Sequence, residues 1–394
     1  MIVNGVGELR PMVKPALRRA WRTLQCAQFG ITPAHAVAMD PVDTSTGSLL
    51  ALLDGTRGTE SLRAEARALG LPDGHLEALL GRLAAAGLLA DAATGRPGKA
   101  GPAAGAVDTA LDPLRADLAA LSVVHPRPEA AARALAARRA HRVQVRGAGR
   151  VGATVAALLS AAGVGTVEVL DSGRVEPWET APGGLPAEAV GERRATAARR
   201  LVNRWARDAP RLGPGTPPED TAGHGGGSGL SLVVVAPRDG LGAYVPDPLP
   251  AEQWLAAGVP HLYAGVLEAT GVVGPLVLPG ATACARCAQE ERTDREPVWP
   301  RLLAQWRSGS PHPLPACDVG LAAAVAGLAV THALALLDGE LPASTGTRWE
   351  MTPPWSEWRA EILTPHPACP CGAARGAEGE RVSAPERTQD TMAG

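Results

Sequence analysis

Lysine and cysteine are both scarce in this sequence of 394 residues. Lysine and arginine total 38, and only Lys14 and Lys99 are lysines, so arginine supplies almost every side-chain cation. The formal net charge of −2 gives no electrostatic basis for binding nucleic acid or an anionic membrane. No apolar core of signal-peptide length stands near residue 1, which predicts a cytoplasmic protein. In such a protein, six cysteines indicate metal binding or catalysis before disulfides.

Uncharged apolar stretches of membrane-spanning length are also rare. Residues 319–337 form one, and 19 residues can just cross a bilayer. The stretch is mostly alanine and glycine, contains Thr331 and His332, and lacks flanking aromatic residues. We therefore interpret it as a buried helix of a layered domain and expect no membrane partner.

Composition and periodicity divide the chain into four parts. Residues 1–92 show helical leucine spacing and predict a small helical domain. Residues 93–125, which begin with a Pro/Gly/Ala-rich stretch, are interpreted as a linker, and residues 126–372 as the main domain. Residues 373–394 are polar and small, which predicts a disordered tail.

The main domain alternates strand and helix patterns. A β-rich run at 142–146 precedes an apolar helix, and a second strand pattern ends at Asp171. Residues 230–236 form a continuous apolar run, as expected for a parallel strand that is buried on both faces. This order predicts an α/β fold with a Rossmann-like, doubly wound sheet.

A glycine motif lies between the first strand and its helix. Gly147, Gly149 and Gly152 have the G-x-G-x-x-G spacing that permits a tight turn, backbone approach to phosphate and close helix packing. Asp171 then stands where a ribose hydroxyl would be bound, and the helix N-terminus favours an anion. The motif alone is weak in a chain with 46 glycines. A dehydrogenase, an adenylating enzyme and a Rossmann-like fold without a ligand all remain open.

Four of the six cysteines form two close pairs. Cys284 and Cys287 have the CxxC spacing, and Cys369 and Cys371 follow near the end of the main domain. Four thiolates can bind zinc tetrahedrally, with His366 as a substitute ligand, whereas unrelated thiols or a disulfide are the alternative. Because four protein ligands leave no open position, we expect a structural zinc that clamps the C-terminal segment to the sheet domain.

Several segments in the same order resemble the ThiF/MoeB superfamily, relatives of the ubiquitin-activating enzymes. They are the glycine loop and strand end at 147–171, "VGERRATAARRLV" at 190–202, "GVVGPLVLPGATACARC" at 271–287, the helix at 317–339, and "CPCG" at 369–372. The resemblance covers residues 140–372. It implies adenylation of a carboxylate with ATP and Mg²⁺, a small carrier protein or precursor peptide as partner, and the homodimer that is common among relatives.

The resemblance also assigns candidate residues, and several depart from the family pattern. Arg150 replaces a usual glycine of the nucleotide loop, and Arg194 stands at the family's phosphate-binding lysine. The magnesium segment falls on "VAPRD", where Asp239 supplies the carboxylate. Cys317 lies where sulfur-transferring members have a reactive cysteine, but an inert cysteine at a helix start is the alternative.

The first 92 residues resemble a winged-helix module of the PqqD-like, peptide-clamp kind. Such modules bind the leader of a ribosomally made peptide by strand addition. Fused to a ThiF-like domain, the module resembles partner proteins of azoline-forming cyclodehydratases, in which the nucleotide site is often degenerate. Two hypotheses result: an adenylyltransferase, or a non-catalytic protein that binds a leader peptide. A nicotinamide-dependent oxidoreductase is a third, weaker one, because no hydride-transfer constellation accompanies the loop.

Overall fold

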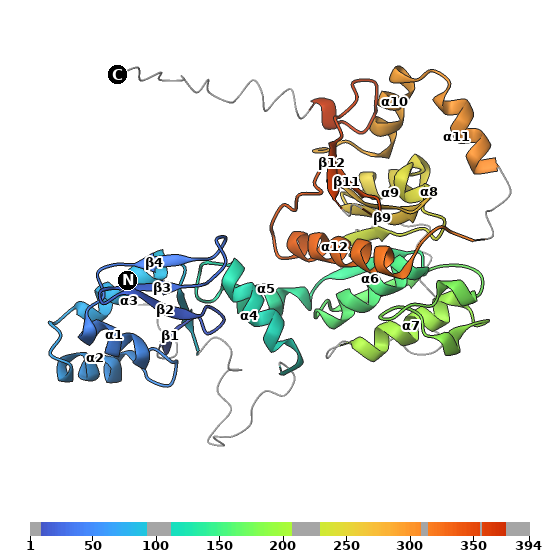
Figure 1. Cartoon of the computed structure of the whole chain (residues 1–394). Coiled ribbons are helices and arrows are strands. Elements are labelled where there is room, and N and C mark those ends of the chain that lie inside the picture. Colours follow the sequence, from blue (N-terminus) through green and yellow to red (C-terminus); the bar gives the residue numbers. More distant parts are fainter. Residues whose placement is uncertain (1–8, 93–111, 207–228, 309–313, 355–356, 376–394) are drawn as a thin grey trace, which may run out of the picture. The chain divides into compact units, whose positions relative to one another are not determined.

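The computed structural model describes residues 9–92, 112–206, 229–308, 314–354 and 357–375 (Figure 1). The chain divides into two compact units, Met1–Ala137 and Arg138–Gly394. Each unit has its own hydrophobic core. The first part of the predicted linker, 93–111, and the end of the predicted tail, 376–394, lie outside the described residues.

A seven-stranded sheet forms the centre of the second unit, in the order β12-β11-β10-β9-β8-β6-β7. Strands β7, β6, β8 and β9 are parallel, whereas β10, β11 and β12 continue the sheet in antiparallel fashion. The predicted α/β class is confirmed, and the antiparallel half makes the sheet mixed. The strands are β6 (Arg142–Arg146), β7 (Thr166–Leu170), β8 (Leu232–Val235), β9 (His261–Leu267), β10 (Thr270–Val277), β11 (Thr347–Met351) and β12 (Trp358–Ile362).

Helices cover both faces of this sheet, and the sequence of β8 is apolar at every position because the strand is buried on both faces. Leu232 and Val234 belong to the core beneath α6 (Arg150–Ala161) and α12 (Val319–Leu337). Val233 points the other way and packs with α9 (Pro248–Ala256). Figure 1 shows α6 and α12 side by side on one side of β9, with α8 (Leu241–Tyr244) and α9 on the other. Strands that are buried on both faces need continuous apolar sequence.

The uncharged stretch at 319–337 is the core helix α12. The Asp318 carboxylate caps its N-terminus by accepting a hydrogen bond from the backbone N–H of Leu321 at 2.9 Å. Val325, Ala326 and Ala329 are fully buried against the sheet. The helix is apolar and long enough to cross a membrane, but its buried face supports its interpretation as a core helix.

Three further helices of the second unit position the candidate sites. Helix α7 (Arg194–Trp205) packs on α6 and β7 and follows the two short 3₁₀ turns at Pro177–Glu179 and Ala187–Ala189. Helices α10 (Ala285–Arg295) and α11 (Trp299–Ser308) stand in the connection between β10 and α12.

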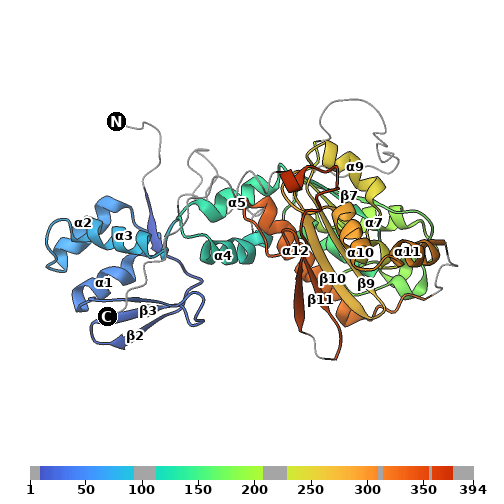
Figure 2. The same ribbon diagram turned by 90° about the horizontal axis from the view of Figure 1, so that it is seen from above.

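The described residues 9–92 of the first unit combine three helices with five short strands. Strands β2 (Arg19–Thr23), β3 (Cys26–Phe29) and β4 (Val37–Met39) form an antiparallel sheet, and β1 (Pro11–Val13) pairs with β5 (Leu89–Asp91). Helices α1 (Thr44–Leu52), α2 (Thr59–Ala68) and α3 (His75–Ala85) lie beside β2 and β3 (Figure 2). The prediction of a helical domain was incomplete, because strands of three to five residues are too short to show an alternating pattern.

The stretch that was interpreted as a linker contains regular structure. A 3₁₀ turn at Asp112–Leu114 leads into α4 (Arg115–Val124), and α5 (Ala130–Arg138) follows. The Lys14 side chain, 1% exposed, donates to the backbone carbonyl of His125 at 2.8 Å. Burial lowers the pKa of Lys14. This contact fixes the C-terminal end of α4 to the residue that follows β1.

Candidate functional site

The turn between β6 and α6 can be made only by glycines. Gly147 has φ +111°, and a Cβ there would lie 1.9 Å from the carbonyl oxygen of Ala236. A Cβ on Gly152 would lie 2.1 Å from the carbonyl oxygen of Gly147. Gly149 is less restricted, since its nearest neighbour would be the Cγ atom of Arg238 at 3.1 Å. The first and third glycines therefore close the turn sterically, and the second lies against the side chain of Arg238.

Asp171 holds this turn from the end of β7. Its Oδ2 atom accepts a hydrogen bond from the backbone N–H of Ala148 at 2.6 Å, and its side chain is 6% exposed. The predicted ribose-binding carboxylate thus lies directly against the glycine loop. One of its oxygens is already used to hold the loop, which leaves Oδ1 for a ligand or a cation.

Arg194, the residue at the family's phosphate-binding position, is a buried member of an ion-pair network. Its Nε atom donates to Glu179 Oε2 at 2.7 Å, and its Nη1 atom donates to the carbonyl of Ser172 at 2.6 Å. Asp171 Oδ1 lies 3.7 Å from Nη1, and the side chains of Arg194 and Glu179 are 4% and 5% exposed. The guanidinium is therefore engaged by the protein itself.

A second arginine stands where solvent can reach it. Arg238, in the turn after β8, is 45% exposed and reaches Glu179 Oε1 at 3.3 Å and Asp171 Oδ1 at 3.8 Å. The next residue, Asp239, is exposed and makes no hydrogen bond or ion pair with the residues that the structure describes. Two arginines and two carboxylates thus alternate beside the glycine loop, with Arg238 as its accessible cation.

Sequence reasoning missed Glu179 and did not assign Arg238 a role. Glu179 ends the 3₁₀ turn that begins at Pro177, where it also accepts a hydrogen bond from the backbone N–H of Glu176 at 2.9 Å. The only signal was a capping pattern in a turn, which is common and carries no functional meaning. Arg238 lies in the segment "VAPRD", in which only Asp239 was given a role.

Arg150 and Cys317 lie together. Arg150 Nη1 donates to the backbone carbonyl of Cys317 at 2.6 Å, so the first residue of α6 contacts the start of α12. Burial raises the pKa of the Cys317 thiol, while Arg150 opposes the shift. The structure therefore brings Cys317 close to the glycine loop but favours its thiol form over a reactive thiolate.

The four paired cysteines converge on one point. Cys284 Sγ lies 3.8 Å from Cys287 Sγ and 3.6 Å from Cys369 Sγ, and Cys287 Sγ lies 3.5 Å from Cys371 Sγ. All four sulfur atoms lie within 4.8 Å of one another. Zinc–sulfur bonds of about 2.3 Å place tetrahedral ligands about 3.8 Å apart, so the cluster fits zinc.

The thiols influence one another's ionisation. A hydrogen bond from the Cys284 thiol lowers the pKa of Cys287 to about 4, and the same hydrogen bond raises the pKa of Cys284. Burial raises the pKa of Cys369 to about 11. Without a cation the protein thus favours one thiolate in the Cys284–Cys287 pair, whereas four adjacent thiolates need a bound metal ion.

His366, considered as a substitute ligand, is not part of the cluster. Its Nε2 atom lies 3.0 Å from Asp294 Oδ2, and its Nδ1 atom accepts a hydrogen bond from the backbone N–H of Ala368 at 3.3 Å. Both ring nitrogens are therefore engaged. The histidine instead shapes the segment that presents Cys369 and Cys371.

A known protein family matches the segment around the glycine loop. The sequence model of the ThiF family matches residues 127–211, which contain the glycine loop, Asp171, Glu179 and Arg194. A search of curated protein sequences returns no match.

Solved structures resemble the fold over nearly the whole chain. E. coli MccB crystallised with MccA-N7isoASN shares 13% identity at a TM-score of 0.66, covering 92% of this chain and 99% of that chain. E. coli MccB with ATP gives a TM-score of 0.65 at 13% identity and the same coverage. The heterocyclase TruD gives 0.57 at 17% identity, covering 96% of this chain but only 45% of its own. At such identities, these likenesses establish the fold.

Proposed function

This chain contains a ThiF-family domain, and from that premise we propose that it is a soluble enzyme that uses ATP to activate a peptide carboxylate. The carboxylate oxygen would attack the α-phosphorus of ATP, forming an acyl-adenylate and releasing pyrophosphate. A bond forms between the carboxylate oxygen and the α-phosphorus, and the α–β phosphoanhydride bond breaks. No further reactant is needed.

The observation that carries this proposal is the set of groups around the glycine loop. The loop places Gly149 at the N-cap of α6, and the N-terminus of a helix favours phosphate. Asp171 at the end of β7 would hold a ribose hydroxyl through Oδ1. Arg238, half-exposed in front of Gly149, would neutralise the polyphosphate in the role that sequence reasoning gave to Arg194.

Magnesium would be held beside the same cation. Asp239 is exposed next to Arg238 and has no described partner, so its carboxylate is available for Mg²⁺. Mg²⁺ commonly binds through one or two carboxylates together with substrate phosphates, and one carboxylate is therefore sufficient in principle. The ion would supply charge neutralisation of the leaving pyrophosphate.

Zinc would have a separate, structural role. Cys284 and Cys287 stand at the start of α10, whereas Cys369 and Cys371 follow β12. A bound zinc would thus tie the last described segment of the chain to the helix that follows β10. Four sulfur ligands leave no position for a substrate, so the ion would take no part in adenylation.

A peptide is favoured as the activated partner over a folded carrier protein. The MccB structures that share this fold were determined with ATP and with MccA peptides, and the likeness covers almost all of both chains. Adenylation by this chain would then act on a short segment that lies across the sheet domain.

A non-catalytic, leader-binding protein is the second candidate, and two observations favour it. The buried pairing of Arg194 with Glu179 removes one cation from the polyphosphate site. In the first unit, every residue of the edge strand β2 is exposed, and Trp21 is 48% exposed, so an extended peptide could add to this edge.

ATP–pyrophosphate exchange by the full chain, with peptides encoded beside its gene, separates the two candidates. Exchange that depends on a free peptide carboxylate supports the enzyme, and absence of both exchange and ATP binding eliminates it. Arg238→Gln should lower ATP affinity and exchange by about tenfold or more, as expected for loss of a charge-assisted contact. Arg204→Gln, on the exposed end of α7, is the matched control and should change neither. Leader binding without exchange would support the second candidate.

A further inference from the structure

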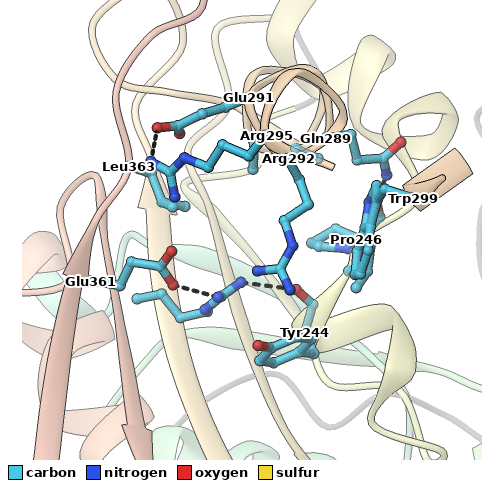
Figure 3. A pocket seen from close by; sticks show the side chains of 13 residues that line it. Tyr244, Pro246, Gln289, Glu291, Arg292, Arg295, Trp299, Glu361 and Leu363 are labelled. Atoms are coloured by element: carbon cyan, nitrogen blue, oxygen red, sulfur yellow. Dashed lines mark hydrogen bonds and ion pairs between the residues drawn. The ribbon is translucent and has the colours of Figure 1, made fainter. Parts of the chain in front are cut away.

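A small cavity in the second unit borders the helix that carries Cys284 and Cys287 and contains none of the glycine-loop residues. Its walls are α10, the residues after α8 and the start of α11, and its floor is formed by β11 and β12 (Figure 3). The free volume of about 40 Å³ holds only a few waters or a group of similar size. A carboxylate group fits this space.

The floor of the cavity is a fixed cation. Arg348 is 8% exposed, donates to Glu350 Oε1 at 2.7 Å and to the carbonyl of Tyr244 at 3.2 Å, and also pairs with Glu361. Its guanidinium carbon lies 4.3 Å from the centre of the Tyr244 ring. These contacts use the donors of Arg348, so this residue shapes the cavity and is held rigidly.

Arg292 is the cation with unused donors. Its guanidinium lies over the Trp299 ring at 4.5 Å and points into the cavity (Figure 3). Its one ion pair joins Nε to Glu296 Oε2 at 3.8 Å, which is too long for a hydrogen bond, and it makes no hydrogen bond with the described residues. Stacking on an aromatic ring orients the planar fork, which suits a carboxylate that accepts two hydrogen bonds.

The other charges of the lining do not cancel this cation. Glu291 pairs with Arg295 at 2.5 Å, and Glu361 pairs with Arg348, so both carboxylates are engaged. Three arginines and two glutamates line the cavity, and Glu296 and Glu350 pair with Arg292 and Arg348 from outside the lining. Trp299 is 6% exposed, and its indole N–H has no acceptor among the described residues.

We propose that this cavity binds a carboxylate of the peptide substrate, other than the carboxylate that is adenylated, through Arg292. The inference rests on the proposed function and adds an acidic group to the description of the substrate. The cavity begins at Tyr244, and α8, whose four residues rise about 6 Å, separates it from the turn that carries Arg238. An extended peptide covers such a distance in a few residues, so the acidic group stands a few residues from the reacting carboxyl.

The test uses the full chain without ATP and three acetylated peptides. Ac-Gly-Asp-Gly-Gly-NH₂ carries a side-chain carboxylate, Ac-Gly-Asn-Gly-Gly-NH₂ is its uncharged match, and Ac-Gly-Asn-Gly-Gly-OH carries only a terminal carboxylate. The readout is the ¹⁵N-indole resonance of Trp299, identified by its loss in Trp299→Phe. We expect saturable shifts with a carboxylate peptide and none with the uncharged amide. The two charged peptides show whether the cavity prefers a side chain or a terminus.

Variants connect the shift to Arg292. Arg292→Met should weaken the carboxylate-dependent titration by about tenfold or more, whereas Arg301→Met, on the exposed face of α11, should leave it unchanged. Equal titration by Ac-Gly-Asp-Gly-Gly-NH₂ and its uncharged match Ac-Gly-Asn-Gly-Gly-NH₂ overturns the inference. Absence of titration by both charged peptides also overturns it. ATP–pyrophosphate exchange is measured separately. Exchange without titration refutes only carboxylate binding in the cavity, and titration without exchange refutes only the proposed adenylation.

Discussion

Replacement of Glu179 should destabilise the sheet domain rather than act on nucleotide affinity alone. The carboxylate lies between two guanidinium groups, Arg194 at 2.7 Å and Arg238 at 3.3 Å, with its side chain 5% exposed. In Glu179→Met, the Arg194 guanidinium stays buried with Asp171 Oδ1 3.7 Å away as its nearest remaining carboxylate. A buried cation that loses its main partner must either remain poorly paired or move toward solvent.

The magnitude follows from the burial of both partners. Removing one member of a buried ion pair costs about 3 to 5 kcal/mol, because the remaining charge is left desolvated. For a unit of this size, each kcal/mol lowers the melting temperature by about 2 to 4 °C, so a fall of about 6 to 20 °C is expected. Arg194→Met should cost a similar amount. The double variant should recover part of the loss, since two apolar side chains can replace a buried pair.

Differential scanning calorimetry of the full chain measures these changes, with Glu192→Met as the matched control. Glu192 pairs with Arg200 at 2.5 Å, but their side chains are 34% and 54% exposed, so Glu192→Met should leave the melting temperature nearly unchanged. A melting temperature of Glu179→Met within about 2 °C of the wild type refutes the reasoning. So does an Arg194→Met variant that loses ATP affinity while keeping its full stability, because Arg194 would then contact phosphate.

Three further outcomes are expected. The purified chain should contain about one zinc ion by elemental analysis, and Cys371→Ser should lower both the zinc content and the melting temperature. A metal-free wild type that is as stable as the zinc-bound wild type would contradict a structural role for zinc. The rate at which iodoacetamide alkylates Cys317 should still rise above pH 9, because burial raises the pKa of this thiol, and Arg150→Met should lower the rate further. Peptide mapping by mass spectrometry measures the rate. Rapid alkylation at pH 7 would contradict this prediction. Burial lowers the pKa of His261 from 6.5 to about 4, so its contribution to stability is complete above pH 6.5 and is lost as the pH falls toward 4. Between pH 7 and pH 5, the free energy of unfolding in urea should fall by about 2 kcal/mol more for the wild type than for His261→Phe. Equal falls in the two proteins would contradict the lowered pKa of His261.

The elements that could be predicted are those whose sequence pattern has one structural solution. Residues 232–235 are apolar at every position and became a strand buried on both faces. Gly147 and Gly152 stand where a Cβ would collide with backbone oxygens, so the turn requires glycine regardless of its neighbours. The two cysteine pairs likewise had to meet if one metal ion binds all four.

The strands of the first unit could not be predicted for a physical reason. All five residues of β2 are exposed, so no alternation of apolar and polar positions marks it. Its conformation depends on backbone pairing with β3 and on contact between Trp21 and Gly47 of α1, where a Cβ would lie 2.9 Å from the indole ring. The pairing joins neighbouring residues of a hairpin and the Trp21–Gly47 contact is long-range, but neither produces an alternation of apolar and polar positions in β2.

The role of Arg194 shows the limit of assigning chemistry by position in a family pattern. A lysine there would be a point charge on a flexible stem, whereas the arginine fork meets Glu179 and the Ser172 carbonyl at the same time. That pairing depends on Glu179, which precedes Arg194 by 15 residues in a turn without any family signal. Because the fork is then occupied, the cation of the proposed polyphosphate site would come from another segment. Arg238 is the side chain that shares Glu179 while remaining 45% exposed, so the same carboxylate that buries one arginine positions the other.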